Sequence, residues 1–288
     1  EIKALKKLNH PGIVKLKEVC LRLGGQTVSS PPLCRLHARL HASSPSHHTH
    51  SHARSSRPPC SKQVIRENNE LFLVFEYLEQ NLYEDMTALK KRGVSSMDES
   101  RIRSTVRQLT ESLAFMHNQG MFHRDVKPEN LLVTGDKVKL ADFGQVREIR
   151  SRPPFTDYVS TRWYRAPELL LKSTTYNFQV DMWAVGCIMC ELYNLRPLFP
   201  AQRESEMLHK IASVCGAPTE QSWPEGVKLA KKMGFKFPSF TSTPLASLIP
   251  SAGADAINLM EQLLVLDPSK RMSAQACLKH PYFTNHAP

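Results

Sequence analysis

Hydrophobic positions near the start of the chain recur at helical spacing and then change to alternation. Apolar side chains three residues apart predict a helix over residues 1–8. The next four residues, 9–12, include His-Pro-Gly and predict a break. Residues 13–19 alternate between apolar and polar side chains, which favours a strand.

The middle of the chain predicts a second strand and a long amphipathic helix. Residues 71–75 form a short apolar run of strand length. Ser96 and Glu99 have the spacing of a capping box, so we expect a helix that opens at Ser96 and closes at Gly120. Its core-facing stripe consists of Ile102, Val106, Leu109, Leu113 and Met116.

Shorter patterns complete the outline. Two brief strands, 131–133 and 138–140, bracket a predicted turn at Gly135 and Asp136. From residue 178 onward the periodicity is mostly helical. A further stripe consists of Ala256, Ile257, Met260, Leu263 and Leu264. The pattern as a whole predicts an α+β chain with a small front part that bears strands and a larger helical back part.

Residues 20–63 differ in composition from everything around them. They are rich in Ser, His, Pro and Arg, and carry six basic residues and no acidic one. Such a segment buries too little apolar surface to offset its ordering entropy, so we expect disorder. Its six histidines leave open a second interpretation, a loose metal-binding module.

Composition narrows the class of protein. With 41% hydrophobic and 23% charged residues, the 288-residue chain is typical of a soluble globular protein. Its longest uncharged apolar run, 182–190, is too short to span a bilayer. More than half of the net charge of +11 lies in residues 20–63, which argues against a nucleic-acid-binding surface.

Seven cysteines at irregular spacing do not form a disulfide framework and suit the reducing cytoplasm or nucleus. Cys187 and Cys190 have the spacing of a redox or zinc pair. They lie within the apolar helical run 182–190, with no second ligand pair nearby, so we interpret them as buried core thiols.

The candidate chemistry lies in the segment 123–130, His-Arg-Asp-Val-Lys-Pro-Glu-Asn, and in Asp-Phe-Gly at 142–144. Asp125 is placed to accept the proton of an attacking hydroxyl, and Lys127 to neutralise a moving phosphoryl group. Asn130 and Asp142 offer the hard oxygen ligands that Mg²⁺ prefers. Ala-Pro-Glu at 166–168 makes a chance match of these short motifs improbable.

These motifs resemble those of the eukaryotic protein kinases. The stretch 156–168, with Thr156, Tyr158 and then Thr-Arg-Trp-Tyr-Arg-Ala-Pro-Glu, is similar to the branch that holds the cyclin-dependent and mitogen-activated kinases. Within it the chain is most similar to the male germ cell-associated, intestinal cell and long-flagella kinase group. The similarity covers nearly all of the chain except residues 20–63.

The resemblance implies a two-lobed protein kinase fold whose N-lobe is truncated before the αC helix. Residues 1–19 and 64–78 would form the partial N-lobe, and residues 79–284 the large, mostly helical C-lobe. Residues 20–63 would be an insert. Because the block from Val19 to Gln63 has residues at its edges that fit intron boundaries, we interpret it as a possible retained intron, with a genuine insertion as the alternative.

The resemblance also implies a role for individual residues. Asp125 and Lys127 would be catalytic, and Asn130 and Asp142 would hold Mg²⁺. The remaining roles would be nucleotide binding (Glu1, Glu76, Leu78, Asn81, Leu132), regulation (Thr156, Tyr158, Arg124, Arg162) and substrate binding (Thr161, Arg165). Two further contacts are expected to be structural: Glu168 with Arg271, and Asp181 with the catalytic loop.

Two departures from the pattern affect the expected activity. The glycine-rich loop and the strand lysine of the family would both precede Glu1, so Glu1 has no partner and we expect this polypeptide, as written, to be inactive. The first residue is not Met, which is typical of a fragment. Gln145 replaces the Leu that usually follows Asp-Phe-Gly, which affects the expected geometry of the activation loop.

The resulting hypothesis is a serine/threonine protein kinase that transfers the γ-phosphoryl group of ATP to proteins, with Arg165 favouring proline after the target. The expected partners are protein substrates and an upstream activating kinase, with no nucleic acid, no membrane insertion and a monomeric state. The expected location is the cytoplasm and nucleus, and by resemblance the cilium or flagellum. The alternative is a catalytically dead scaffold or pseudokinase fragment.

Overall fold

A computed structural model describes residues 2–22, 70–149 and 162–285. The chain divides into two compact units, which we call the strand unit (residues 15–77) and the helical unit (residues 1–14 and 78–288). Most of the segment predicted to be a disordered insert lies outside the described residues.

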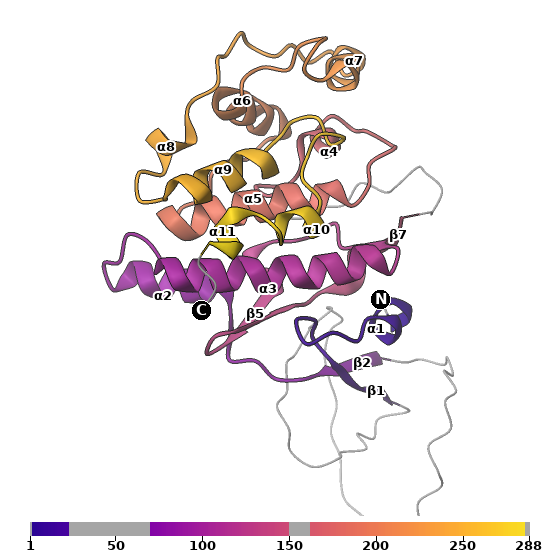
Figure 1. Ribbon diagram of the computed structural model, residues 1–288. Coiled ribbons are helices and arrows are strands. Elements are labelled where there is room, and N and C mark those ends of the chain that lie inside the picture. Colours follow the sequence, from indigo (N-terminus) through magenta and orange to yellow (C-terminus); the bar gives the residue numbers. More distant parts are fainter. Residues whose placement is uncertain (1, 23–69, 150–161, 286–288) are drawn as a thin grey trace, which may run out of the picture. The chain divides into compact units, whose positions relative to one another are not determined.

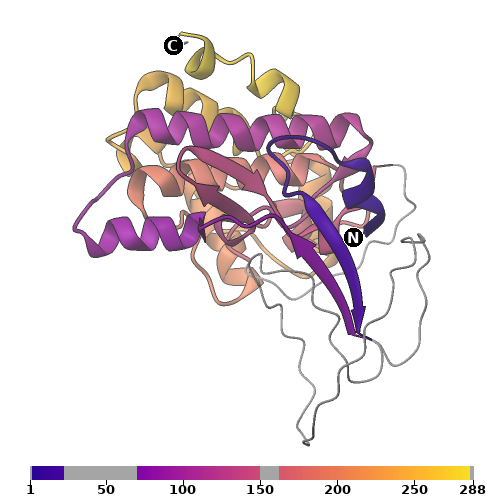
Figure 2. The same cartoon turned by 90° about the horizontal axis from the view of Figure 1, so that it is seen from below.

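The strand unit is an antiparallel ribbon of β1 (Leu16–Arg22) and β2 (Glu70–Phe75), visible as two arrows in Figure 2. The end of the ribbon is closed by Glu76, whose backbone N–H donates to the Lys15 carbonyl (3.0 Å) and whose carboxylate accepts from the Lys15 N–H (2.7 Å). The strand at residues 71–75 is thus confirmed.

The strand predicted at 13–19 is wrong at both ends. It begins at Leu16 and continues to Arg22, three residues into the segment predicted to be disordered. The reason is backbone pairing, since the last residues of β1 stand opposite the first residues of β2 and find their hydrogen-bond partners there. Ile13 instead forms an isolated parallel bridge to Leu140 in the helical unit.

The helical unit begins with α1 (Ile2–Lys7), which confirms the first predicted helix. The turn after it is fixed by Gly12, whose carbonyl accepts hydrogen bonds from the Leu140 N–H and the Ser112 hydroxyl, both at 2.8 Å. A Cβ at Gly12 would stand within 2.1 Å of the Ser112 oxygen, so no larger residue fits. Val14 adds a third tie by donating to the Leu140 carbonyl at 2.9 Å.

Helices supply most of the remaining helical unit. Its longer helices are α2 (Leu82–Lys91), α3 (Glu99–Asn118), α5 (Gln179–Asn194), α6 (Glu204–Cys215), α7 (Pro224–Lys232) and α9 (Ala254–Leu263). Its four-residue helices are α4 (Pro167–Leu170), α8 (Leu245–Leu248), α10 (Ala274–Cys277) and α11 (Pro281–Thr284).

Short strands in the same unit present the chemistry-bearing loops. β3 (Gln80–Asn81), β5 (Leu131–Thr134) and β6 (Lys137–Leu140) form one antiparallel sheet in the order β3-β5-β6. β4 (Met121–Phe122) pairs with β7 (Arg147–Glu148). The β5–β6 hairpin turns at Gly135, whose φ of 55° is the left-handed conformation that glycine tolerates. The predicted strands and turn are confirmed.

The core of the helical unit is built around α5, which Figure 1 shows between α3 and α9. Nearly every side chain of α5 is buried, because the helix has neighbours on all sides. The predicted stripe on α3 is buried throughout. Cys187 and Cys190 lie in this core, confirming their burial, and desolvation raises the pKa of both thiols.

The beginning of α3 corrects the capping-box prediction. The helix begins at Glu99, and its N-cap is Asp98 rather than Ser96. The Asp98 carboxylate accepts from the backbone N–H groups of Ser100 (2.9 Å) and Arg101 (3.4 Å). These hydrogen bonds, led by one from the Ser100 hydroxyl, hold the pKa of Asp98 below its ordinary value.

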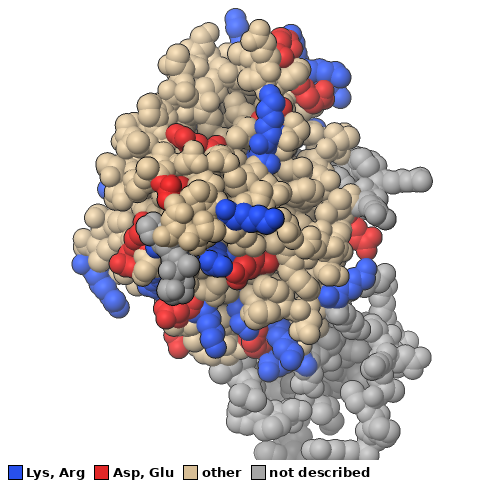
Figure 3. All heavy atoms as spheres, in the orientation of Figure 1, with Lys and Arg blue, Asp and Glu red and all other residues tan. Residues whose placement is uncertain are grey.

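Two surface properties bear on the class of protein. Within the described residues, no helix combines the length and the apolarity needed to cross a membrane. On the face shown in Figure 3, acidic and basic side chains are interspersed rather than gathered into one basic patch.

Candidate active site

The backbone of segment 123–130 is hydrogen-bonded to the carboxylate of Asp181, which lies in the first turn of α5. Its Oδ2 accepts from the His123 N–H (2.9 Å) and its Oδ1 from the Arg124 N–H (2.8 Å). Arg124 has a φ of 74°, a left-handed conformation that costs on the order of 1–3 kcal/mol for a residue with a side chain. The buried carboxylate offsets this strain, which confirms Asp181 as the anchor of the loop.

Two histidines complete this anchor. His117 donates from Nε2 to Asp181 Oδ2 at 2.9 Å. Burial alone would raise the pKa of Asp181, but the hydrogen bond and charge of His117, with a smaller effect from His123, keep that pKa below its ordinary value. His123 accepts from the Asp125 N–H at Nδ1, so its Nε2 carries the proton and donates to the Ala141 carbonyl at 3.0 Å.

Two of the predicted polar residues of the loop, Lys127 and Asn130, converge on the carboxylate of the third, Asp125. Lys127 Nζ lies 2.7 Å from Asp125 Oδ2, and Asn130 Nδ2 lies 3.2 Å from the same oxygen. Asn130 also donates to the Asp125 backbone carbonyl at 2.7 Å. The Asp125 carboxylate therefore accepts hydrogen bonds from two side-chain donors, which fix its orientation.

Asp142 is delivered to the same region by the end of β6. The Ala141 N–H, directly before it, donates to the Asn130 carbonyl at 2.9 Å. Asp142 itself adopts a left-handed conformation (φ 61°) and caps the short 3₁₀ turn Phe143–Gln145, with Oδ1 accepting from the Gly144 N–H at 3.3 Å. A backbone hydrogen bond thus joins Asn130 to Ala141, the residue directly before the other predicted metal ligand, Asp142.

The donor set fits Mg²⁺. Because the Asn130 amide nitrogen faces Asp125, its side-chain oxygen is the atom left to meet a cation. Asp142 uses Oδ1 for its backbone contact and is exposed, so its second oxygen is accessible. One amide oxygen and one carboxylate are ligands of the type Mg²⁺ takes when phosphates and water complete its shell.

The predicted nucleotide-binding residues are distributed over both units. Glu76 belongs to the strand unit, whereas Leu78, Asn81 and Leu132 belong to the helical unit. Asn81 and Leu132 are brought together as partners in the β3–β5 pair. The Asn81 side chain also caps α2, accepting from the Glu84 N–H at 2.9 Å. Glu1 lies outside the described residues.

The predicted regulatory and substrate-binding residues are only partly described by the structure. Thr156, Tyr158 and Thr161 lie outside the described residues. Arg124 donates from Nη1 to the Gln145 carbonyl (3.2 Å) and lies over the Tyr176 ring at 5.5 Å. Arg162 and Arg165 both lie beside Glu204 at the start of α6, at 3.6 Å and 3.2 Å.

The expected contact between Glu168 and Arg271 is confirmed as a bidentate, buried ion pair. Arg271 Nη1 and Nη2 lie 2.7 Å and 2.9 Å from the two carboxylate oxygens of Glu168. The guanidinium also lies over the Trp183 ring at 5.2 Å. This pair joins Ala-Pro-Glu at 166–168 to the core around α5.

Sequence reasoning missed a buried acid behind the catalytic segment. The Tyr164 hydroxyl donates to Glu191 Oε2 at 2.7 Å, inside the core. Burial, reinforced by the charge of Glu129, raises the pKa of Glu191 to about 7, although the Tyr164 bond and Lys90 lower it. A Glu within the otherwise apolar helix pattern of α5 is the sequence signal that could have found it.

The raised pKa of Glu191 predicts that the free energy of unfolding depends on pH. Between pH 4.5 and 7 the folded chain retains a proton on Glu191 that the unfolded chain has released, so the free energy of unfolding should fall as pH rises. A shift of this size corresponds to about 3 kcal/mol between pH 5 and pH 8. Urea unfolding of Glu191→Gln, compared with the unsubstituted chain at both pH values, should show the variant gaining relative stability at pH 8.

The exposed Glu79→Gln is the matched control for that measurement, because Glu79 lies at the surface. Its difference from the unsubstituted chain should stay constant with pH. A Glu191→Gln difference that is equally constant would show that Glu191 does not titrate in this range.

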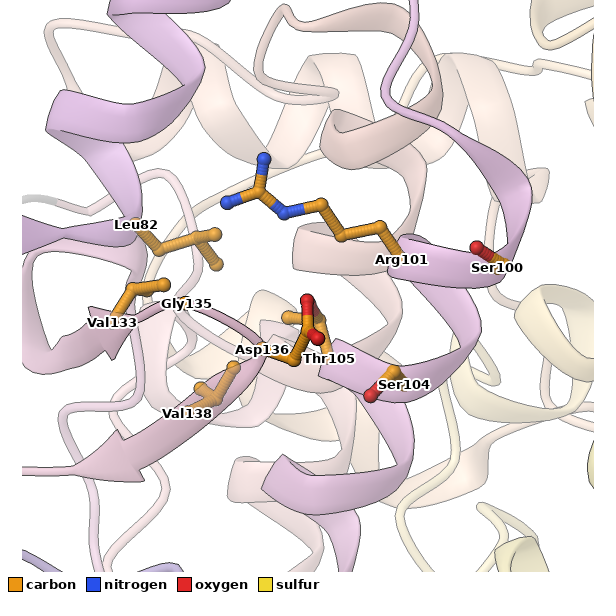
Figure 4. Close-up of a pocket in the computed structure, with 9 residues that line it drawn as sticks. All are labelled: Leu82, Ser100, Arg101, Ser104, Thr105, Val133, Gly135, Asp136 and Val138. Atoms are coloured by element: carbon orange, nitrogen blue, oxygen red, sulfur yellow. The ribbon is translucent and has the colours of Figure 1, made fainter.

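A cavity among the described residues lies apart from this chemistry. Its volume is about 260 Å³, and it lies between α3 and the β5–β6 hairpin. Figure 4 shows Arg101 and Asp136 projecting over it, with Leu82 and Val133 on one side. None of the predicted catalytic or metal-binding residues lines it.

A buried acidic anchor, a fixed carboxylate with an adjacent lysine, and two hard oxygen ligands are the parts of a phosphoryl-transfer site. The protein kinase domain family matches residues 55–283. The chain belongs to the protein kinase family, which confirms the resemblance drawn from its motifs and the two-lobed fold class. The match begins within the segment predicted to be an insert.

Several serine/threonine kinases are similar to nearly the whole chain. ICK of Mus musculus is 46% identical over 284 residues, which cover 98% of this chain and 37% of the relative. MAK of Homo sapiens is 45% identical over 284 residues, covering 98% and 38%. Cyclin-dependent kinase F-4 of Oryza sativa is 43% identical over 283 residues, covering 98% and 51%. The chain thus spans about half or less of the length of these relatives.

Proposed function

We propose that this chain is the kinase domain of a protein that transfers the γ-phosphoryl group of ATP to serine or threonine hydroxyls of other proteins. The observation that carries the proposal is the convergence of Lys127 and Asn130 on the Asp125 carboxylate. The named serine/threonine kinases among its relatives support the same class of reaction.

In this proposal each residue has one role. Asp125 receives the proton of the substrate hydroxyl, for which its carboxylate is oriented by two donors. Lys127 would neutralise charge on the transferred phosphoryl group. Asn130 and Asp142 would hold Mg²⁺, which supplies charge neutralisation on the phosphates when bound. Leu78, Asn81 and Leu132 of the helical unit, and Glu76 of the strand unit, are the residues proposed to contact ATP.

The test is a transfer assay on the protein expressed from its full coding sequence. With ATP labelled at the γ-phosphate, Mg²⁺ and a serine-containing peptide, we expect label on serine or threonine of the peptide. Chelation of Mg²⁺ should abolish the transfer. Binding of partners without any transfer, under conditions where the protein is folded, would favour the scaffold alternative.

We also propose a preference for proline directly after the target residue. Proline has no backbone N–H. A binding surface that offers no hydrogen-bond acceptor at that position therefore disfavours every other residue, because the N–H of that residue would be left without a partner. Arg165 is the residue assigned to this selection, and its buried position beside α6 supports a fixed role. Peptides that differ only in Pro or Ala at this position will measure the preference.

Regulation by phosphorylation of Thr156 and Tyr158 is a third part of the proposal. Each phosphate adds about −1.5 to −2 charge and strong acceptor oxygens. Arg124 and Arg162, which the resemblance assigns to this role, would receive them through charge-assisted bonds that would order the segment for substrate. Phosphatase treatment should therefore lower the transfer rate, whereas equal rates before and after verified dephosphorylation would contradict this regulation.

The cellular setting is proposed from the same resemblance. An upstream kinase would act on Thr156, and the protein would act as a monomer in the cytoplasm and nucleus or at the cilium. Imaging of the endogenous protein is the measurement that separates these locations.

A further inference from the structure

The carboxylate of Glu191, near the end of α5, is bound by a neutral group in the core of the helical unit. Glu191 is 4% exposed, and the Tyr164 hydroxyl donates to its Oε2 at 2.7 Å. Burial, followed by the charge of Glu191, raises the pKa of Tyr164, so the hydroxyl keeps its proton and stays a donor around neutral pH. The protonation state of this pair is therefore set by Glu191.

Charged groups face Glu191 from two neighbouring elements. Glu129 lies in the 3₁₀ turn Pro128–Asn130 of the catalytic loop, and Lys90 lies at the end of α2. Burial is the main cause that raises the pKa of Glu191 to about 7. The charge of Glu129 adds to this rise, whereas the Tyr164 bond and the charge of Lys90 oppose it. A carboxylate of the catalytic loop thus responds to whether Glu191 is neutral or charged.

The helices that pack against α5, namely α3 and α9, present groups that are apolar, exposed or already bonded. α9 meets α5 with Met260, whose sulfur lies 3.3 Å from Cys190 Sγ, and the Glu261 side chain of α9 is exposed. Burial raises the pKa of the two α5 thiols, so both stay neutral. On α3, Glu99 accepts from the Tyr193 hydroxyl at 2.6 Å. The catalytic loop and α2 therefore remain the charged neighbours that matter.

The side chain of Glu129 is the neighbour that can move. Its Oε2 is buried and has no hydrogen-bond partner among the described residues, whereas Glu191 is fixed in a helix with neighbours on all sides. Two charged carboxylates in a poorly solvated region repel each other, and the one that is partly exposed, Glu129, can move toward water. The next residue, Asn130, holds Asp125 through its side chain, at 2.7 Å and 3.2 Å. A displacement of Glu129 therefore reaches the proposed base.

We infer that Glu191 is a positioning residue for phosphoryl transfer: its neutral form keeps Glu129 and Tyr164 in place, and its ionisation displaces them and lowers the rate. It touches neither substrate nor nucleotide in this scheme. Tyr164 directly precedes Arg165, so the same carboxyl joins the catalytic loop to the proposed substrate-binding segment. The inference rests on the proposed function, because it concerns the transfer proposed above.

The experiment measures kcat/KM for transfer to a serine-containing peptide between pH 6 and pH 8, on the protein expressed from its full coding sequence. The neutral fraction of an acid with a pKa of about 7 falls about tenfold over this range. We therefore expect kcat/KM of the unsubstituted protein to fall about tenfold relative to that of Glu191→Gln, which is neutral at every pH. The ratio of the two proteins cancels the titration of ATP and of the peptide.

Two further variants should shift the midpoint of this profile in opposite directions. Tyr164→Phe removes the hydrogen bond that lowers the pKa of Glu191, so the midpoint should move to higher pH. Glu129→Gln removes the charge that raises this pKa, so the midpoint should move to lower pH. The exposed Glu261→Gln is the matched control, and its profile should superpose on that of the unsubstituted protein. The two opposite shifts test the inference even if Glu191→Gln fails to fold.

The outcomes distinguish this inference from the proposed function. Unsubstituted protein that transfers phosphate, with a pH profile parallel to that of Glu191→Gln, overturns the inference alone. Circular dichroism at each pH reports on folding, and a loss of rate that follows loss of folded protein also overturns it, because the role is then structural only. Folded, unsubstituted protein that transfers no phosphate at any pH removes the proposed function and the inference with it.

Discussion

Asp125→Asn should lower kcat for phosphoryl transfer by about 10³-fold, the midrange of what a lost general base costs. The affinity for ATP should change little. The substitution conserves the shape of the side chain, and the anchors of the loop do not involve the Asp125 side chain, since Asp181 binds the backbone of His123 and Arg124.

The size of the effect follows from the contacts of Asp125. Its Oδ2 accepts from Lys127 at 2.7 Å and from Asn130 at 3.2 Å. An amide at this position loses the basic oxygen that takes the proton and also loses the negative charge that attracts Lys127. Positioning survives, while proton acceptance does not, so the loss should appear in kcat rather than in nucleotide binding.

The matched control is Asp136→Asn, on the exposed turn between β5 and β6. It removes an equal charge away from the catalytic loop, and kcat should stay within a factor of two or so. The measurement is the initial rate at saturating ATP and peptide, together with ATP affinity by titration. An Asp125→Asn rate close to that of the control would falsify the assignment of the base.

The catalytic segment could be predicted because its chemistry is local in sequence. Asp125, Lys127 and Asn130 lie within six residues, and a short loop of this kind must bring such neighbours together. Asp142 could be added because a strand that ends at a polar residue presents it at the edge of a sheet. The geometry agrees, since one backbone hydrogen bond joins Ala141 to Asn130.

The start of α3 shows where local patterns fail. Ser96 and Asp98 are both good N-cap residues, and the spacing to Glu99 favoured Ser96. The tertiary structure decides between them, because Met97 is buried and its N–H donates to the Leu192 carbonyl of α5 at 3.1 Å. That contact holds the backbone at Met97 outside the helix and leaves Asp98 to cap it.

Glu204 could not be predicted for a different reason. Its partners lie between 32 and 42 residues away in sequence, and nothing in the pattern around α6 marks a charged residue as buried or shared. Ion pairs between distant segments depend on how helices pack. The pair of Glu168 and Arg271, which is more distant still, was expected only because the resemblance supplied it.

Glu168→Gln should lower the free energy of unfolding by about 3–5 kcal/mol, the cost of breaking a buried ion pair by removing one partner. The side chain of Arg271 is 0% exposed and that of Glu168 is 3% exposed, so water cannot replace the lost carboxylate. Arg271 would keep its bonds to the carbonyls of Val265 and Gln179, at 3.0 Å and 2.8 Å, and its charge would stay buried without a counter-charge.

Urea unfolding followed by tryptophan fluorescence measures this change directly, because Arg271 lies over the Trp183 ring. The matched control is Glu225→Gln. The partner of Glu225, Lys228, lies 3.7 Å away, and both side chains are mostly exposed. This substitution should therefore change the free energy of unfolding by less than about 0.5 kcal/mol. Arg271→Lys keeps the charge but loses the bidentate geometry, so its loss should be intermediate. If Glu168→Gln were no more destabilising than the exposed control, the buried pair would not be what holds Ala166–Glu168 to the core, and the packing of α4 would have to do so instead.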